Sequence, residues 1–263
     1  TRSSINAGID LCSAAQALTR GTISVIQGMV LVSTDTAAVQ SMWQDTVAIF
    51  FFVAVIVLMI AECLSSANNL MRLAAEEHPE LTVKVFDSKS ASIGLGALAV
   101  QVARYAVRGV AFDPLCELTK RLIDDTVVYF SLDTLEYLQR GGRIGRATAL
   151  AGGLLQIKPI LTFDRKDGMI STAAKVRGRR GVQQRLIELA TELAAKHPGE
   201  EYNLVVCDGN VPEEGAALEA ALTRALPNAH RVLHGKIDAT LAVHLGPNLL
   251  GVGVQFLNSK LPA

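Results

Sequence analysis

One stretch, Ser131–Thr162, places the tightest limits on how this chain can fold. It opens with a short apolar-periodic turn, TLEYL, and then breaks at Gly141 and Gly142, which have backbone freedom that other residues lack. Arg143 and Arg146 flank a small apolar pair, and the following run ALAGGLLQ is too rich in alanine and glycine for an exposed helix. The run ALAGGLLQ is therefore predicted to pack tightly against another part of the chain.

Strands are predicted where β-branched and apolar residues form short runs, and helices where apolar residues recur at helical spacing. The predicted strands are 22–32, 81–86, 127–130, 157–161, 169–176, 203–208, 230–237 and 249–256. The predicted helices are 67–78, 97–108, 113–123, 181–196, 213–226 and 238–244. Because strands alternate with helices, this order predicts a parallel sheet with helices on both faces.

The predicted fold class is α/β with two domains. A parallel-sheet α/β/α N-terminal domain is expected over residues 1–160, and a smaller α/β C-terminal domain over residues 161–263. The boundary is placed near Pro159–Asp167, where an apolar strand-like run gives way to the polar turn DRKDG. In open sheets of this kind ligands bind beyond the carboxyl ends of the strands, so the turns at Ser65 and at Ser88–Ser92 are candidates for one crevice.

Charge and cysteine usage exclude several classes of function. Lys+Arg and Asp+Glu balance at 25 each, which leaves no electrostatic footprint for nucleic acid and no polybasic membrane anchor. The four cysteines are widely spaced, fit no metal-ligand pattern and are expected to be reduced thiols of a cytoplasmic protein. The apolar run Val47–Ala61 is shorter than the roughly 20 residues of a membrane span, so a buried strand with part of a helix is predicted, and a membrane-surface segment is the alternative.

The sequence contains no nucleophile elbow, P-loop, HExxH or paired-cysteine zinc motif, so no catalytic activity, cofactor or metal is predicted. His244 precedes a Gly-Pro turn, where its ring N–H can meet a carboxylate or phosphate; the alternative is a histidine that caps a helix carbonyl. Ser65 and Ser66 precede a predicted helix and can face an anion, or simply cap that helix. Asp133 and Glu136 lie three apart on one predicted helical face, and a solvated face explains the two carboxylates as well as catalysis does.

The densest positive patch consists of Lys175, Arg177, Arg179 and Arg180. Such a cluster is usually a solvated turn, and less often a docking site for an acidic partner or a phosphate.

Several blocks, in order, resemble the DegV family of bacterial fatty-acid-binding proteins. They are LSS at 64–66, FDSKSASIGLG at 86–96, the block 135–161 with its GGRI string, KVRG at 175–178 and HLGP at 244–247. The resemblance implies two α/β domains that clamp one long-chain fatty acid of the palmitate or oleate class in a cleft between them. The acyl chain would lie in an apolar tunnel.

The resemblance also implies which residues hold the carboxylate. Ser65, with Ser66 beside it, matches the serine of the family's LSGT turn, and His244 matches the histidine of its HxGPG motif. The upstream TSQP-like turn has no clean counterpart, and counting back from Ser65 by the family spacing leads to Ser33 and Thr34. Asn248 stands where HxGPG has its second glycine, and asparagine tolerates a left-handed backbone better than most residues.

Related proteins present the bound acid to a fatty acid kinase, which phosphorylates its carboxylate. The resemblance therefore makes the Lys175–Arg180 cluster a candidate for docking that kinase. The predicted function is a carrier without turnover of its own. The alternative is a phosphotransferase or hydrolase that uses the same cleft, with the arginine cluster on a phosphate.

Overall fold

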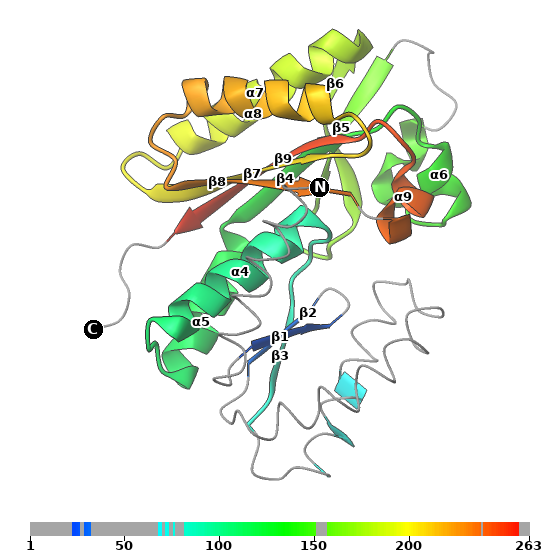
Figure 1. The fold of residues 1–263 in the computed structure, drawn as a ribbon. Coiled ribbons are helices and arrows are strands. Elements are labelled where there is room, and N and C mark those ends of the chain that lie inside the picture. Colours follow the sequence, from blue (N-terminus) through cyan, green and yellow to red (C-terminus); the bar gives the residue numbers. More distant parts are fainter. Residues whose placement is uncertain are drawn as a thin grey trace. The chain divides into compact units, whose positions relative to one another are not determined.

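In a computed structural model, residues 23–26, 29–32, 68–69, 72–73, 76, 82–150, 157–237 and 239–257 are described, and they belong to two units (Figure 1). The first unit comprises Thr1–Ser88 and Leu95–Arg121, and the second comprises Lys89–Gly94 and Leu122–Ala263. The domain boundary was expected after residue 160, but this position lies inside strand β5 (Ile157–Phe163). This strand pairs on both sides within the second unit, so the chain cannot divide there.

The first unit contains a three-stranded sheet in the order β1-β2-β3. The single strand predicted over 22–32 is two strands, β1 (Ile23–Ile26) and β2 (Met29–Val32), which pair antiparallel. Strand β3 (Lys84–Asp87) pairs antiparallel with β2. The described strands of this unit therefore do not form the parallel sheet that was expected.

Two helices follow β3, namely α4 (Ile93–Val107) and α5 (Phe112–Asp124). The start of α4 lies earlier than predicted, because Gly94 and Gly96 are its first-turn residues rather than a lead-in. The helix ends at Val107, just before the predicted stop signal Gly109, whose φ of +85° is a left-handed conformation that glycine adopts without strain.

The second unit is built on a six-stranded sheet in the order β6-β5-β4-β9-β7-β8. Besides β5, its strands are β4 (Thr126–Ser131), β6 (Ile170–Arg177), β7 (Glu201–Asp208), β8 (Arg231–Lys236) and β9 (Leu250–Leu257). Its helices are α6 (Glu136–Arg140), the 3-10 helix η1 (Gly145–Leu150), α7 (Gly178–Ala195), α8 (Pro212–Ala225) and α9 (Ala239–Leu245).

The α/β class is confirmed, but the strand directions differ from the expectation. Among the strands that the structure describes, only β7 and β8 pair in parallel, with α8 as the crossover between them. The last strand, β9, lies between β4 and β7 and is antiparallel to both. Alternation of strands and helices along a sequence does not determine where a late strand inserts, and here it inserts in the middle of the sheet.

Both faces of this sheet carry apolar cores. One core joins α7 and α8 to inward residues of β9 such as Val252 and Val254. The other joins Phe130 and Leu161 to α6, η1 and α9. Figure 1 shows α7 and α8 along one face of the sheet, with α6 and α9 beside each other near one end.

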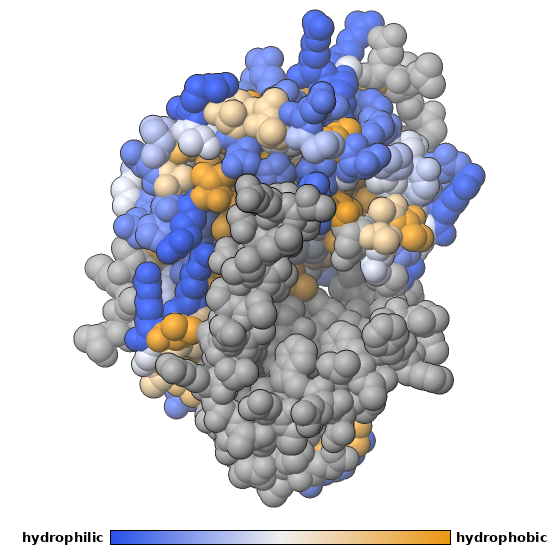
Figure 2. All heavy atoms as spheres, in the orientation of Figure 1, coloured by the Kyte–Doolittle hydropathy of each residue, from blue (hydrophilic) through white to orange (hydrophobic). Residues whose placement is uncertain are grey.

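Helix α7 illustrates why the sequence folds this way. Its buried residues recur at helical spacing, which creates one apolar stripe. These residues are Val182, Leu186, Leu189 and Ala190. Figure 2 shows mainly hydrophilic residues on the exposed surface around this helix. Among the described residues, no helix is both long enough and apolar enough to cross a membrane; the run Val47–Ala61 lies outside them.

Candidate functional site

His244 lies in the last turn of α9, where the chain leaves the helix through a left-handed turn. Gly246 has a φ of +72°, and its N–H donates a 2.8 Å hydrogen bond to the Ala242 carbonyl. The Asn248 N–H then donates a 2.7 Å bond to the carbonyl of Gly209. The segment that carries His244 is therefore fixed by backbone hydrogen bonds at both ends of the turn.

The His244 ring is half-buried against Gly141, the first glycine of the GGRI string. Its Nδ1 atom is buried and has no hydrogen-bond partner, and a Cβ built on Gly141 would overlap this same atom. Burial lowers the pKa of His244 below its usual 6.5, and the positive charge of Arg143 lowers it further. The imidazole is thus neutral at pH 7.

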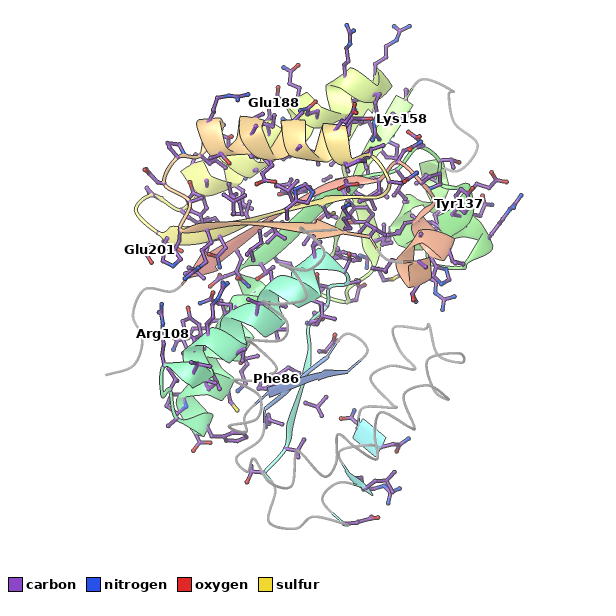
Figure 3. All side chains as sticks on the ribbon, viewed as in Figure 1. Phe86, Arg108, Tyr137, Lys158, Glu188 and Glu201 are labelled. Atoms are coloured by element: carbon purple, nitrogen blue, oxygen red, sulfur yellow. The ribbon has the colours of Figure 1, made fainter. Side chains whose placement is uncertain are left out.

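A second close approach joins α6 to the turn after α9. Tyr137, labelled in Figure 3, lies beside α9, and a Cβ on Gly246 would lie 2.5 Å from Cδ2 of its ring. The Gly141 N–H donates a 2.9 Å hydrogen bond to the Tyr137 carbonyl, and the Arg143 guanidinium donates to the Gly141 carbonyl. Two glycines, one on each side, allow the α6 and α9 segments to meet.

The remainder of the GGRIGR string attaches η1 to the hairpin of β5 and β6. Gly145 has a φ of +56° and lies directly on the backbone of Ile170. Arg146 donates a 2.7 Å hydrogen bond to Oδ2 of Asp164 and also pairs with Asp167. The Met169 N–H and the Arg146 guanidinium both lower the pKa of Asp167. Gly145 and Arg146 thus hold η1 against this hairpin, whereas the side chains of the run ALAGGLLQ, for which tight packing was predicted, lie outside the described residues.

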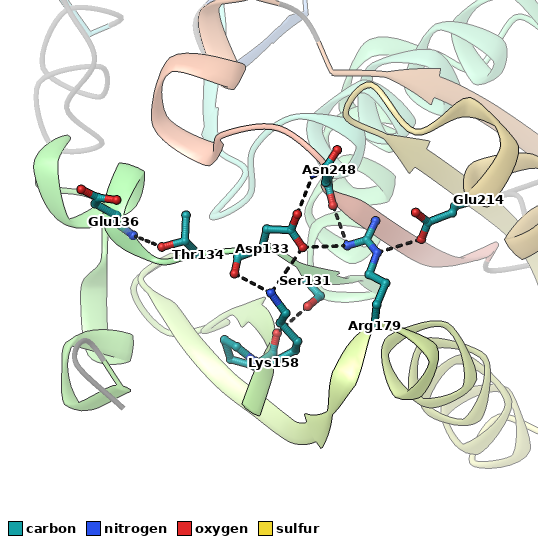
Figure 4. Close-up of polar contacts among 9 residues, drawn as sticks. Ser131, Asp133, Thr134, Glu136, Lys158, Arg179, Glu214 and Asn248 are labelled. Atoms are coloured by element: carbon teal, nitrogen blue, oxygen red, sulfur yellow. Dashed lines mark hydrogen bonds and ion pairs between the residues drawn. The ribbon is translucent and has the colours of Figure 1, made fainter. Parts of the chain in front are cut away.

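Asp133 lies at the centre of a polar network that the sequence did not reveal (Figure 4). Asn248 Nδ2 donates a 2.6 Å hydrogen bond to Oδ2 of Asp133, and Lys158 Nζ donates a 2.7 Å bond to the Asp133 carbonyl. Arg179 donates to the Asn248 carbonyl at 2.6 Å and to Oε2 of Glu214 at 2.7 Å. Of the two explanations left open for Asp133, the solvated helical face is wrong, because this residue precedes α6 and is half-buried in the network.

The residues predicted for the site fall into three groups. Ser33, Thr34, Ser65 and Ser66 lie outside the described residues. His244 lies in the α6–α9 assembly described above. Of the positive cluster, three residues are exposed and Arg179 is turned into the network, with 26% of its side chain exposed. The exposed three are Lys175, Arg177 and Arg180.

The contacts of a second histidine show no nucleophile and base arrangement. His234 Nδ1 lies 2.6 Å from Oε2 of Glu219, and its Nε2 lies 3.1 Å from Oδ2 of Asp208. Each ring nitrogen of His234 thus lies within hydrogen-bond distance of a carboxylate of the chain itself. Burial, with a smaller effect of Asp208, raises the pKa of nearby Cys207 to about 12, so this residue remains a thiol. Among the described residues, no group of His, Cys, Asp and Glu is arranged to hold a metal ion.

Several known proteins are similar to this chain in sequence, and several solved structures are similar to it in fold. A family model described as "Uncharacterised protein, DegV family" matches residues 52–257. A DegV domain-containing protein of Clostridium perfringens is 33% identical over 196 residues, which cover 74% of this chain and 68% of the relative. Another, of Streptococcus pyogenes serotype M1, is 31% identical over 200 residues, 76% of this chain and 69% of the relative.

Solved structures of similar fold are described as fatty-acid-binding proteins. One from Thermus thermophilus has a TM-score of 0.61 and 28% identity, and the match covers 65% of this chain and 60% of that chain. A stearic-acid-binding protein from Eubacterium ventriosum has a TM-score of 0.66 and 27% identity, over 73% of this chain and 65% of that chain. The present chain thus spans less than two thirds of the length of these proteins. With the family model matching well over half of its residues, this chain belongs to the DegV family.

Proposed function

We propose that this protein binds one long-chain fatty acid, with the carboxylate accepting a hydrogen bond from His244. The observation that carries this proposal is the geometry of the imidazole: its Nδ1 is buried against Gly141 without a hydrogen-bond partner. Burial also lowers the pKa of the ring, which favours its neutral form. No acceptor meets a proton on Nδ1, so the single proton of the neutral ring belongs on Nε2. An Nε2–H that is held in this way donates to an anionic oxygen.

The resemblance supplies the other carboxylate ligands in this proposal. Ser65 donates a second hydrogen bond to the carboxylate, with Ser66, Ser33 and Thr34 as further candidates. Hydrogen bonds to an ionised acceptor are about twice as strong as neutral ones. Burial of the acyl chain, at about 0.8 kcal/mol per CH₂ group, supplies most of the affinity.

In this proposal the bound acid is presented to a fatty acid kinase, which phosphorylates the carboxylate. The exposed basic residues Lys175, Arg177 and Arg180 are the candidates for docking the kinase. Arg179 is the fourth candidate, and its guanidinium would have to give up its hydrogen bonds to Glu214 and Asn248 to contact the kinase.

Replacing His244 or Ser65 with alanine is expected to weaken binding of oleate by about ten- to a hundredfold each. A hydrogen bond to a charged group is worth roughly 1.5–3 kcal/mol, and about 1.4 kcal/mol corresponds to a tenfold change in Kd. The measurement is displacement of a fluorescent fatty acid by oleate.

His230→Ala is the matched control, because His230 is an exposed histidine of the same unit. It is expected to bind oleate like the parent. If His244→Ala and Ser65→Ala both retain the parent affinity, the carboxylate site is assigned to the wrong residues.

A further inference from the structure

Asn248 makes a contact that a glycine at this position would lack. Its φ of +63° is a left-handed conformation, which asparagine adopts more readily than other non-glycine residues. From this conformation its side-chain amide donates the 2.6 Å hydrogen bond to Asp133. The residue thus combines the backbone shape of a glycine with a polar link to another part of the unit.

Asp133 is itself held from two further directions. Lys158 on β5 donates to its carbonyl at 2.7 Å, and its Nζ lies 3.4 Å from Oδ1 of the carboxylate. Arg179 at the start of α7 lies 3.6 Å from the same oxygen. Two cations therefore neutralise the carboxylate, and Figure 4 shows it between them and Asn248. A carboxylate that several partners hold in place can fix the position of the Asn248 amide that is bonded to it.

The Asp133–Asn248 bond joins the same two segments that meet at His244. Asp133 leads into α6, which ends at Gly141 against the His244 ring. Asn248 follows His244 through the turn at Gly246, on which the Tyr137 ring lies. The α6 segment is thus attached at both of its ends to the end of α9 and the turn that follows it, by the imidazole at Gly141 and by the Asp133–Asn248 bond before α6.

We infer that Asp133 and Asn248 are positioning residues, which hold the His244 ring against Gly141 and so orient its Nε2–H toward the ligand carboxylate. This inference rests on the proposed function for its ligand, but the orientation of the ring does not. At metal sites, removal of the partners that orient a ligating histidine lowers affinity by about ten- to a hundredfold, and an effect at the lower end of that range is expected here.

Asn248→Gly is the variant that isolates this link. Glycine retains the left-handed backbone and the carbonyl that Arg179 binds, and it removes only the amide bonded to Asp133. The variant is expected to bind oleate about tenfold more weakly. Its His244 is expected to become more hydrated, so the imidazole titration followed by NMR moves to higher pH. Arg143 is the charged group that acts on this titration, and it stays unchanged.

Two substitutions of Asp133 complete the test. Asp133→Asn retains an oxygen that accepts the Asn248 amide, so its His244 titration is expected to stay closer to the parent than that of Asp133→Ala. A double variant combines Asp133→Ala with Asn248→Gly. It is expected to bind oleate as tightly as whichever single variant binds oleate less tightly, because both substitutions remove the same hydrogen bond.

If Asn248→Gly lowers Tm but leaves both the His244 titration and oleate binding at the parent values, the pair is only a structural brace and the inference is overturned. If the parent itself does not bind oleate, the proposed function fails. The His244 titration then still decides the positioning role, because it is measured without ligand.

Discussion

Replacing Gly145 with alanine is expected to lower the free energy of unfolding by about 3 kcal/mol or more. Two costs add at this position. The φ of +56° is left-handed, which penalises a residue with a Cβ by roughly 1–2 kcal/mol. In addition, the new Cβ would lie 2.6 Å from the carbonyl oxygen and 2.9 Å from the nitrogen of Ile170. Backbone atoms of a paired strand cannot rotate away, so η1 must separate from β6.

Gly142→Ala is the matched control for this experiment. Gly142 has a similar φ of +67°, but a Cβ there would meet nothing within 4 Å. Its expected cost is only the conformational part, roughly 1–2 kcal/mol. Urea denaturation of both variants measures the difference. Equal losses of stability in the two variants would show that Gly145 does not lie against β6 as described.

Gly141→Ala is expected to affect binding more than stability, with oleate affinity reduced by about tenfold or more. Gly141 has a φ of −78°, which alanine adopts without strain. The atom that its Cβ would overlap is Nδ1 of His244, in a side chain that can rotate. The protein therefore accommodates the methyl group by displacing the imidazole, and the displaced Nε2–H no longer points at the carboxylate. Oleate titration and urea denaturation of the same variant separate the two effects.

A double variant shows whether Gly141 acts through His244. If it does, adding Gly141→Ala to His244→Ala weakens oleate binding no further than His244→Ala alone, because the group being displaced is already absent. Parent-like affinity of Gly141→Ala would contradict the packing of His244 against this glycine.

The extents of the elements were predictable because they depend on local patterns. The apolar stripe of α7 and the glycine that ends α4 are both visible within a few residues of sequence. The order of the strands was not. β9 lies between β4 and β7, and no local periodicity records which distant strands pair with it.

The candidate site, too, was predictable only where its signal is local in the sequence. His244 could be singled out because a histidine before a Gly-Pro turn is a local signal. Its contact with Gly141 could not, since the two residues are distant in sequence and meet only when α6 lies against α9. Likewise, the positive cluster shows where cations gather, but not that Arg179 turns inward to Glu214 while its neighbours stay exposed.

Native mass spectrometry of the freshly purified protein tests the central claim most directly. The expected spectrum contains a one-to-one adduct, and denaturation is expected to release a long-chain fatty acid of the palmitate or oleate class. The measured mass of the released acid then gives the length of acyl chain that the protein accommodates. A spectrum of the unliganded protein alone, unchanged after addition of palmitate or oleate, would contradict the proposal that this protein carries a fatty acid.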